Sequence, residues 1–333
     1  MEETGPGRNP TIAVLVPCFN EEASVAAVVA GFRAALPDAY IFVYDNNSTD
    51  GTAERAADAG AHVRSQPLQG KGHVVRRMFA DIEADIYVMV DGDSTYDALS
   101  APAMVGMLVA GDLDMVNARR TGPSLGAYRQ GHVLGNAFFS FLIGALFGRR
   151  INDLLSGYRV FSRRFVKSFP VYSGGFQIET EMTVHALELG LPVGEMDTPY
   201  GARPEGSFSK LNTYKDGARI LKMVATLLIQ LRPLETFGIA ALLCASAALV
   251  LGAPLFFEFA RTGLVSRLPT AVLATGFMML GGVLSGTAAV LGGVARGRRE
   301  AKQMAYLRHR GPGRPPERQT SVPNSETFTD PSA

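Results

Sequence analysis

Residues 85–97 read DIYVMVDGDSTYD, an apolar run that favours a β-strand and ends in an acidic turn. Two earlier segments share this design, because 11–17 (TIAVLVP) and 40–44 (YIFVY) each precede a polar cluster. Helical periodicity separates the runs, as in 25–36, where apolar residues fall on one face. Strands alternating with helices predict an α/β fold with a mostly parallel sheet. The polar clusters then lie at the carboxyl edge of the sheet and converge on one crevice, where such sheets bind ligands.

Composition excludes several classes of protein. The chain has 333 residues, of which 19% are charged and 47% hydrophobic, so disorder is not its main state. A formal net charge of +1 argues against nucleic-acid binding through bulk positive charge. The two cysteines, Cys18 and Cys244, lie too far apart in sequence and character to form a disulfide framework. The apolar excess lies after about residue 215.

The C-terminal third predicts a membrane hairpin. Residues 237–257 and 268–295 contain no charged side chain, and 21 helical residues span about 30 Å, the thickness of a bilayer core. Cations flank both segments, which places the catalytic domain and the C-terminus in the cytoplasm of a multi-pass inner-membrane protein of bacterial type. Small residues in 268–295 suit close helix packing and a homo-oligomer. The alternative is a buried hairpin in a soluble core.

We therefore expect five regions. They are a flexible N-terminus (1–10) without a signal peptide, a cytoplasmic catalytic domain (11–214), an amphipathic juxtamembrane helix (215–235), two membrane helices (236–295) and a basic, then disordered tail (296–333). The apolar stretch 137–148 is too short to span a bilayer and is either interfacial or part of the core.

The acidic turn predicts a metal site. Asp91 and Asp93 flank a glycine directly after a strand, and two carboxylates at that spacing can bind one hard divalent cation that bridges to phosphates. The alternative is a turn in which both only accept backbone hydrogen bonds. Lys71 lies between two glycines before a predicted helix, a place suited to phosphate, although an isolated lysine there is more often a surface residue.

Six strings in the same order resemble family-2 glycosyltransferases, and more narrowly the polyprenyl-phosphate glycosyltransferases, which include dolichyl-phosphate mannose synthase and its bacterial relatives. The strings are VPCFNEE (16–22), DNNSTDGT (45–52), GKGHVVRRMF (70–79), VDGDSTYD (90–97), DLLSGYRVFSRR (153–164) and RPEGSFSKL (203–211). The resemblance covers about residues 10–230 and implies a GT-A, nucleotide-diphosphosugar fold of Rossmann-like type.

The resemblance also implies roles for single residues. Those expected around the donor nucleotide are Pro17, Phe19, Glu21, Asp45, Asn46, Lys71 and Gly72. Asp91 and Asp93 would bind Mg²⁺ or Mn²⁺, and Thr95 stands where some relatives have a further ligand, Gln. Those expected around the acceptor phosphate are Arg119, Arg129, Arg203, Ser209 and Lys210. Asp91, Asp93, Arg119 and Arg129 form the expected catalytic set. The alternative for the cations is binding to anionic lipid surfaces.

The expected reaction is inverting transfer of a sugar, favoured as a UDP-sugar, to a polyprenyl phosphate in cell-envelope biogenesis. A phosphate monoester is largely dianionic at neutral pH, so this acceptor needs no general base. Asp153 would orient the donor sugar or an arginine, or cap a turn. A processive polysaccharide synthase is set aside because the chain has no tryptophan and only two candidate spans. The remaining alternative is a membrane protein of the same fold that binds nucleotide sugars without catalysis.

Overall fold

A computed structural model describes residues 10–121, 144, 147–148, 151–171, 177–201, 226, 229 and 232–312. Its centre is a seven-stranded sheet in the order β3-β2-β1-β4-β6-β5-β7. The strands are β1 (Ile12–Cys18), β2 (Tyr40–Asp45), β3 (His62–Ser65), β4 (Ile86–Met89), β5 (Met115–Thr121), β6 (Arg159–Ser162) and β7 (Val193–Pro199). Only β6 runs antiparallel to its neighbours, so the sheet is mixed and mostly parallel as predicted.

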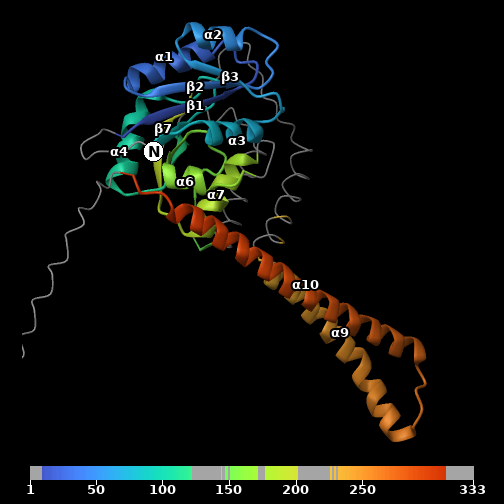
Figure 1. Ribbon diagram of the computed structural model, residues 1–333. Coiled ribbons are helices and arrows are strands. Elements are labelled where there is room, and N and C mark those ends of the chain that lie inside the picture. The colour runs from blue at the N-terminus through green and yellow to red at the C-terminus, as the bar shows by residue number, and fades with distance from the viewer. Residues whose placement is uncertain are drawn as a thin grey trace, which may run out of the picture.

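Helices cover both faces of the sheet (Figure 1). One face carries α1 (Val25–Ala35), α2 (Thr52–Asp58) and α4 (Ala101–Ala110), which follows the short helix η1 (Ala98–Ser100). The other carries α3 (Lys71–Asp81), α6 (Arg163–Ser168) and α7 (Ile178–Leu189). Alternate strand residues pack into different cores, since Val14 and Val16 face α1 whereas Ala13 and Leu15 face α3. The two layers of helices hold the sheet between them, and the polar loops lie at one edge of that sheet.

The parallel register brings three loops together. Cys18 pairs with Asp45, and Leu15 pairs with Met89, so β1, β2 and β4 end at one edge. The loops that follow contain Asn20, Asn47 and Ser94, which are non-glycine residues with φ values of 53°, 63° and 58°. Left-handed backbone is uncommon outside glycine, and it turns each chain sharply away from its strand.

Two long helices extend from the sheet domain as a hairpin (Figure 1). They are α9 (Pro233–Thr262) and α10 (Leu268–Leu307), and both are long and apolar enough to cross a membrane. Only 17% of the most apolar window of each is buried, so a hairpin enclosed in a soluble core, the alternative above, does not fit. α10 also continues to Leu307, through the start of the segment expected to be a basic tail.

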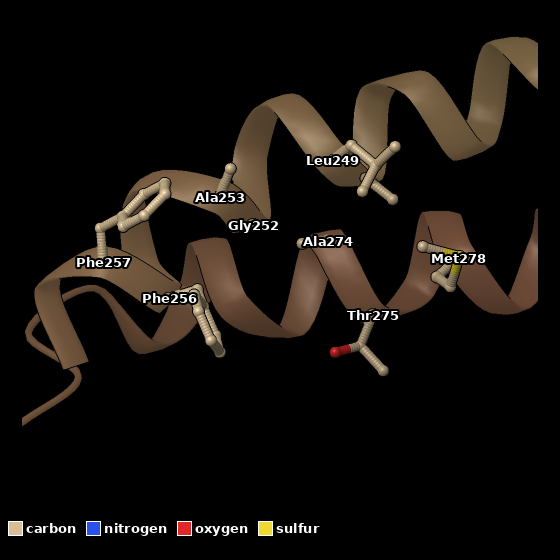
Figure 2. Close-up of a pocket in the computed structure, with 9 residues that line it drawn as sticks. Leu249, Gly252, Ala253, Phe256, Phe257, Ala274, Thr275 and Met278 are labelled. Carbon is tan, nitrogen blue, oxygen red and sulfur yellow. The ribbon is translucent and has the colours of Figure 1, made fainter. Parts of the chain in front are cut away.

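Small residues let the two helices approach each other. A Cβ on Gly281 would lie 3.3 Å from the carbonyl oxygen of Ala241, which is closer than most side chains tolerate. Toward the tip the helices part and leave an apolar groove of about 450 Å³ (Figure 2). Leu249 and Ala253 of α9 line it opposite Met278 of α10. The groove lies between α9 and α10, away from the polar sheet edge.

Candidate active site

A buried lysine joins the third helix to the acidic turn. Lys71, the first residue of α3, donates to Oδ1 of Asp91 and to Oε1 of Glu179, each at 2.5 Å. The side chains of Lys71 and Glu179 are only 9% and 6% exposed. Burial alone would lower the pKa of Lys71, but the two carboxylates outweigh it and raise that pKa. Lys71 is thus a fixed cation beside the predicted metal turn, where it can face the diphosphate of a donor.

The loop before β6 packs directly on Asp91. A Cβ on Gly157 would lie 2.2 Å from Oδ2 of Asp91, so only glycine leaves room for that carboxylate. The fully buried guanidinium of Arg159 holds the loop by donating to the carbonyl oxygens of Leu154, at 2.7 Å, and Ser156, at 3.0 Å. Burial lowers the pKa of Arg159 to about 10, which leaves it protonated at neutral pH.

Asp93 is oriented by its own turn. Its Oδ1 accepts from the Thr95 hydroxyl at 2.6 Å and from the Thr95 backbone N–H at 3.2 Å. Thr95, at the position where some relatives have Gln, therefore acts on a predicted metal ligand. Carboxylate oxygens suit Mg²⁺ or Mn²⁺. Within the described ranges no three His, Cys, Asp or Glu side chains gather for an ion, so a bound metal would complete its shell with diphosphate oxygens and water.

Asn46 fastens the loop that leads to Lys71. Its Nδ2 donates to the carbonyl oxygens of Gln66 and Leu68, both at 2.8 Å, and its Oδ1 accepts from Gly70 N–H at 2.7 Å. Its amide thus positions the segment that precedes Lys71, and the base or ribose contact expected of Asn46 stays a prediction. The neighbouring Asp45 is buried, and its Oδ1 has no hydrogen-bond partner among the residues that the structure describes.

The start of α1 is tied to the acidic turn. The hydroxyl of buried Ser24 donates to the carbonyl oxygen of Gly92 at 2.7 Å and lies 3.3 Å from Oε2 of Glu21. Pro17 and Phe19 are half-buried at the end of β1, and Gly72 is buried in the first turn of α3. The residues expected around the nucleotide therefore lie at one sheet edge. Their contacts with a nucleotide stay predictions.

Of the three arginines predicted to bind the acceptor phosphate, the structure describes only Arg119. Arg119 on β5 makes a bidentate ion pair with Asp197 on β7, in which Nη2 lies 2.5 Å from Oδ2, so a phosphate would have to compete with that carboxylate. Its hydrogen bonds keep the pKa of Asp197 low. The next residue, Arg120, makes a buried bidentate pair with Asp153 at 2.7 and 2.8 Å. Asp153 thus orients an arginine, one of the roles considered for it.

Four of the residues predicted to bind the acceptor phosphate lie outside the described ranges, namely Arg129, Arg203, Ser209 and Lys210.

Sequence reasoning missed Glu179, Gly157, Arg159 and Arg120. Glu179 stands 108 residues from Lys71, and a contact at that separation leaves no periodic pattern. Its one signal is a pair of acidic residues in the first turn of the helix, in the string GGFQIETEM. Gly157 and Arg159 belong to the DLLSGYR string, where a glycine and a cation after an apolar pair favour a tight, anchored loop.

The mixed sheet, the converging loops and the acidic turn beside a buried lysine define a nucleotide-sugar-dependent glycosyltransferase of the GT-A fold. The chain belongs to glycosyl transferase family 2, whose family model matches residues 13–169. It is 34% identical over 284 residues to the glycosyltransferase AglJ of Haloferax volcanii, a match that covers 85% of this chain and 91% of the relative. Protein RfbJ of Shigella flexneri is 56% identical over 122 residues, which cover 36% of this chain and 95% of RfbJ.

A solved structure supports the same class. Glucosyl-3-phosphoglycerate synthase from Mycobacterium tuberculosis, in complex with Mn²⁺, UDP and phosphoglyceric acid, superposes with a TM-score of 0.54. It is 27% identical, and the match covers 66% of this chain and 78% of the synthase. That enzyme binds UDP with a divalent metal, which supports a divalent metal in this chain.

Proposed function

We propose that the chain transfers a sugar from a UDP-sugar to a polyprenyl phosphate at the cytoplasmic face of a membrane. The observation that carries this proposal is the fusion of the crevice to two long apolar helices whose side chains stay largely exposed. A water-soluble acceptor would not require such a hairpin, whereas an isoprenoid phosphate stays in the bilayer through its tail. The cations that flank the hairpin favour a cytoplasmic catalytic domain.

Three carboxylates of the crevice support an acceptor that is already ionised. Asp91 and Glu179 both face Lys71, and Asp153 faces Arg120, so these carboxylates have cationic partners. Transfer to a hydroxyl would need a base free to take the proton. A phosphate dianion brings its own nucleophilic oxygen, which fits this arrangement.

In the proposed reaction, an oxygen of the acceptor phosphate attacks the anomeric carbon from the side opposite UDP. The new C–O bond forms as the bond to the diphosphate breaks, and UDP leaves with both electrons. Lys71 stabilises the charge that develops on the diphosphate. Asp91 and Asp93 would hold Mg²⁺ or Mn²⁺, which supplies Lewis-acid stabilisation of the same leaving group when bound. Arg129, Arg203, Ser209 and Lys210 are proposed to hold the acceptor phosphate together with Arg119.

The test is a transfer assay with purified full-length protein in nanodiscs, a panel of UDP-sugars, and undecaprenyl phosphate, read by mass spectrometry of the lipid. We expect one donor to give a glycosylated lipid in the presence of Mg²⁺ or Mn²⁺. Asp93→Ala should abolish the product, while Asp58→Ala, an exposed carboxylate on α2, should leave the rate unchanged. Donor binding without a lipid product from any donor would refute transfer and favour the binding-only alternative.

A further inference from the structure

The final turns of α10 form part of the catalytic domain. The helix runs without interruption from Leu268 in the membrane hairpin to Leu307. Figure 1 shows its C-terminal end reaching the sheet domain beside α6 and α7. The sequence predicts a basic tail from 296 onward, but the helix continues to Leu307, and Lys302 and Tyr306 contact the sheet domain.

The first docking contact is centred on a fully buried carboxylate. Tyr306 donates its hydroxyl proton to Oδ2 of Asp114 at 2.9 Å. Asp114 also accepts from the hydroxyl of Ser162 at 2.6 Å and from Nε of Arg164. The Arg164 guanidinium lies 5.1 Å from the centre of the Tyr306 ring, a cation–π distance. One residue of α10 thus completes a hydrogen-bonded cluster inside the catalytic domain.

The second contact lies one helical turn earlier. Nζ of Lys302 is 2.7 Å from Oε2 of Glu188, and both side chains are only 14% exposed. Burial limits screening by water and salt, so this pair is held more firmly than a surface ion pair. Residues 302 and 306 are four apart and share one helix face, which gives α10 two points of attachment.

Both attachment points are on elements that carry site residues at their opposite ends. Asp114 directly precedes β5, and Arg119 lies five residues, or roughly 16 Å, along the strand. Glu188 lies in the last turn of α7, and Glu179, which contacts Lys71, is about 14 Å away in the first turn. A strand in a central sheet and a packed helix are stiff over such lengths, so they transmit the position of α10 to the crevice.

We infer that Lys302 and Tyr306 are positioning residues that hold the crevice at a fixed place relative to the membrane, so that it reaches the head group of a lipid acceptor. This inference rests on the proposed lipid-phosphate acceptor. Loss of both contacts leaves donor binding intact because neither residue touches the donor edge of the sheet. It lowers the efficiency with which a membrane-embedded acceptor is used, because the domain then samples many heights and tilts above the bilayer.

The experiment compares the full-length protein with the double variant Lys302→Ala, Tyr306→Phe in nanodiscs that contain undecaprenyl phosphate. We expect kcat/KM for the lipid to fall about 10-fold, while the Kd for the UDP-sugar stays within twofold. Arg299→Ala, which removes an exposed cation from the same helix, should leave both values unchanged. A wild-type kcat/KM for the lipid, or an equal loss of donor binding, would overturn the inference.

A charge exchange tests the second contact directly. Lys302→Glu alone should lower lipid transfer, and addition of Glu188→Lys should restore it. If Lys302 contributed only to a generic helix surface, the second substitution would not restore transfer.

Spin labels at Asp58→Cys and Arg267→Cys, with Cys244→Ser, report the distance between the sheet domain and the hairpin. The double variant should broaden that distribution, and an unchanged width overturns the inference. If the wild-type protein glycosylates no lipid, the proposed function has failed, and the distance measurement alone tests the attachment.

Discussion

Replacing Glu179 by Gln removes one of the two carboxylates that face Lys71 and keeps the size of the side chain. In the described structure Lys71 lies 2.5 Å from both Asp91 and Glu179, so the variant keeps one negative partner. If Asp91 turned toward a bound metal, however, Glu179 would be the partner that remains on Lys71. The variant should therefore be affected more in turnover than in folding.

The contacts of Lys71 indicate how much stability and how much turnover the variant should lose. Loss of one member of a buried ion pair costs about 3–5 kcal/mol when the other charge is left alone, and because Asp91 remains, we expect about 2 kcal/mol. That corresponds to a fall of about 4–8 °C in the unfolding midpoint of a domain of this size. A misplaced cation at the leaving group costs about 100-fold in kcat, comparable to the loss of one preorganised donor.

The assay is transfer of a labelled sugar to lipid phosphate, together with thermal unfolding in the same detergent. Glu181→Gln is the matched control, because residue 181 is in the same helix turn but points to another side of α7. We expect Glu181→Gln to keep wild-type kcat within twofold. If Glu179→Gln kept more than half of the wild-type kcat, or lost no more than the control, the assignment of Glu179 as the positioning partner of Lys71 would be refuted.

Three other changes probe the same domain. Gly157→Ala should abolish turnover, since its Cβ would lie 2.2 Å from Oδ2 of Asp91, and a rate above a tenth of wild type would show that the loop gives way freely. Asn46→Ala removes three hydrogen bonds from the 66–70 loop and should raise the KM for the donor about 10-fold, measured by initial rates, with kcat changed less. Burial, aided by a nearby cation, lowers the pKa of His185 to about 3, so the unfolded chain binds a proton between pH 6.5 and 3 that the native chain does not. Stability should therefore fall as pH drops below 6.5, by roughly 3 kcal/mol at pH 4.5, and chemical denaturation of His185→Gln should show a smaller drop.

Strands β1, β2 and β4 could be predicted because each is an apolar run closed by a polar cluster. The run before Asp91, for example, became β4 with its acidic turn at the expected edge. The reversed direction of β6 could not be predicted, because a run as short as RVFS does not indicate whether the strand is parallel or antiparallel to its neighbours. Cations within 296–307 suggested a solvated tail, yet Lys302 and Tyr306 pair with residues more than a hundred positions away.

The candidate site shows the same division. Asp91 was predicted from a local motif, because an aspartate pair after a strand is visible in a short window, whereas the role of Lys71 followed from the family resemblance of the string GKGHVVRRMF. Glu179 and Arg120 act through partners on other elements, which only the tertiary fold brings into reach. The metal-binding, nucleotide and acceptor roles themselves stay predictions, to be tested by the variants above.

The reversed strand β6 has a consequence for how this enzyme can be remodelled. β5 ends at Thr121 and β6 begins at Arg159, and both points lie at the same sheet edge, because the two strands are antiparallel. Lengthening or exchanging the connection between those two points would leave the pairing of β1, β2 and β4 untouched. An exchange that keeps Asp153 and Gly157, which contact Arg120 and Asp91, therefore alters one connection and preserves the strands that carry the acidic turn.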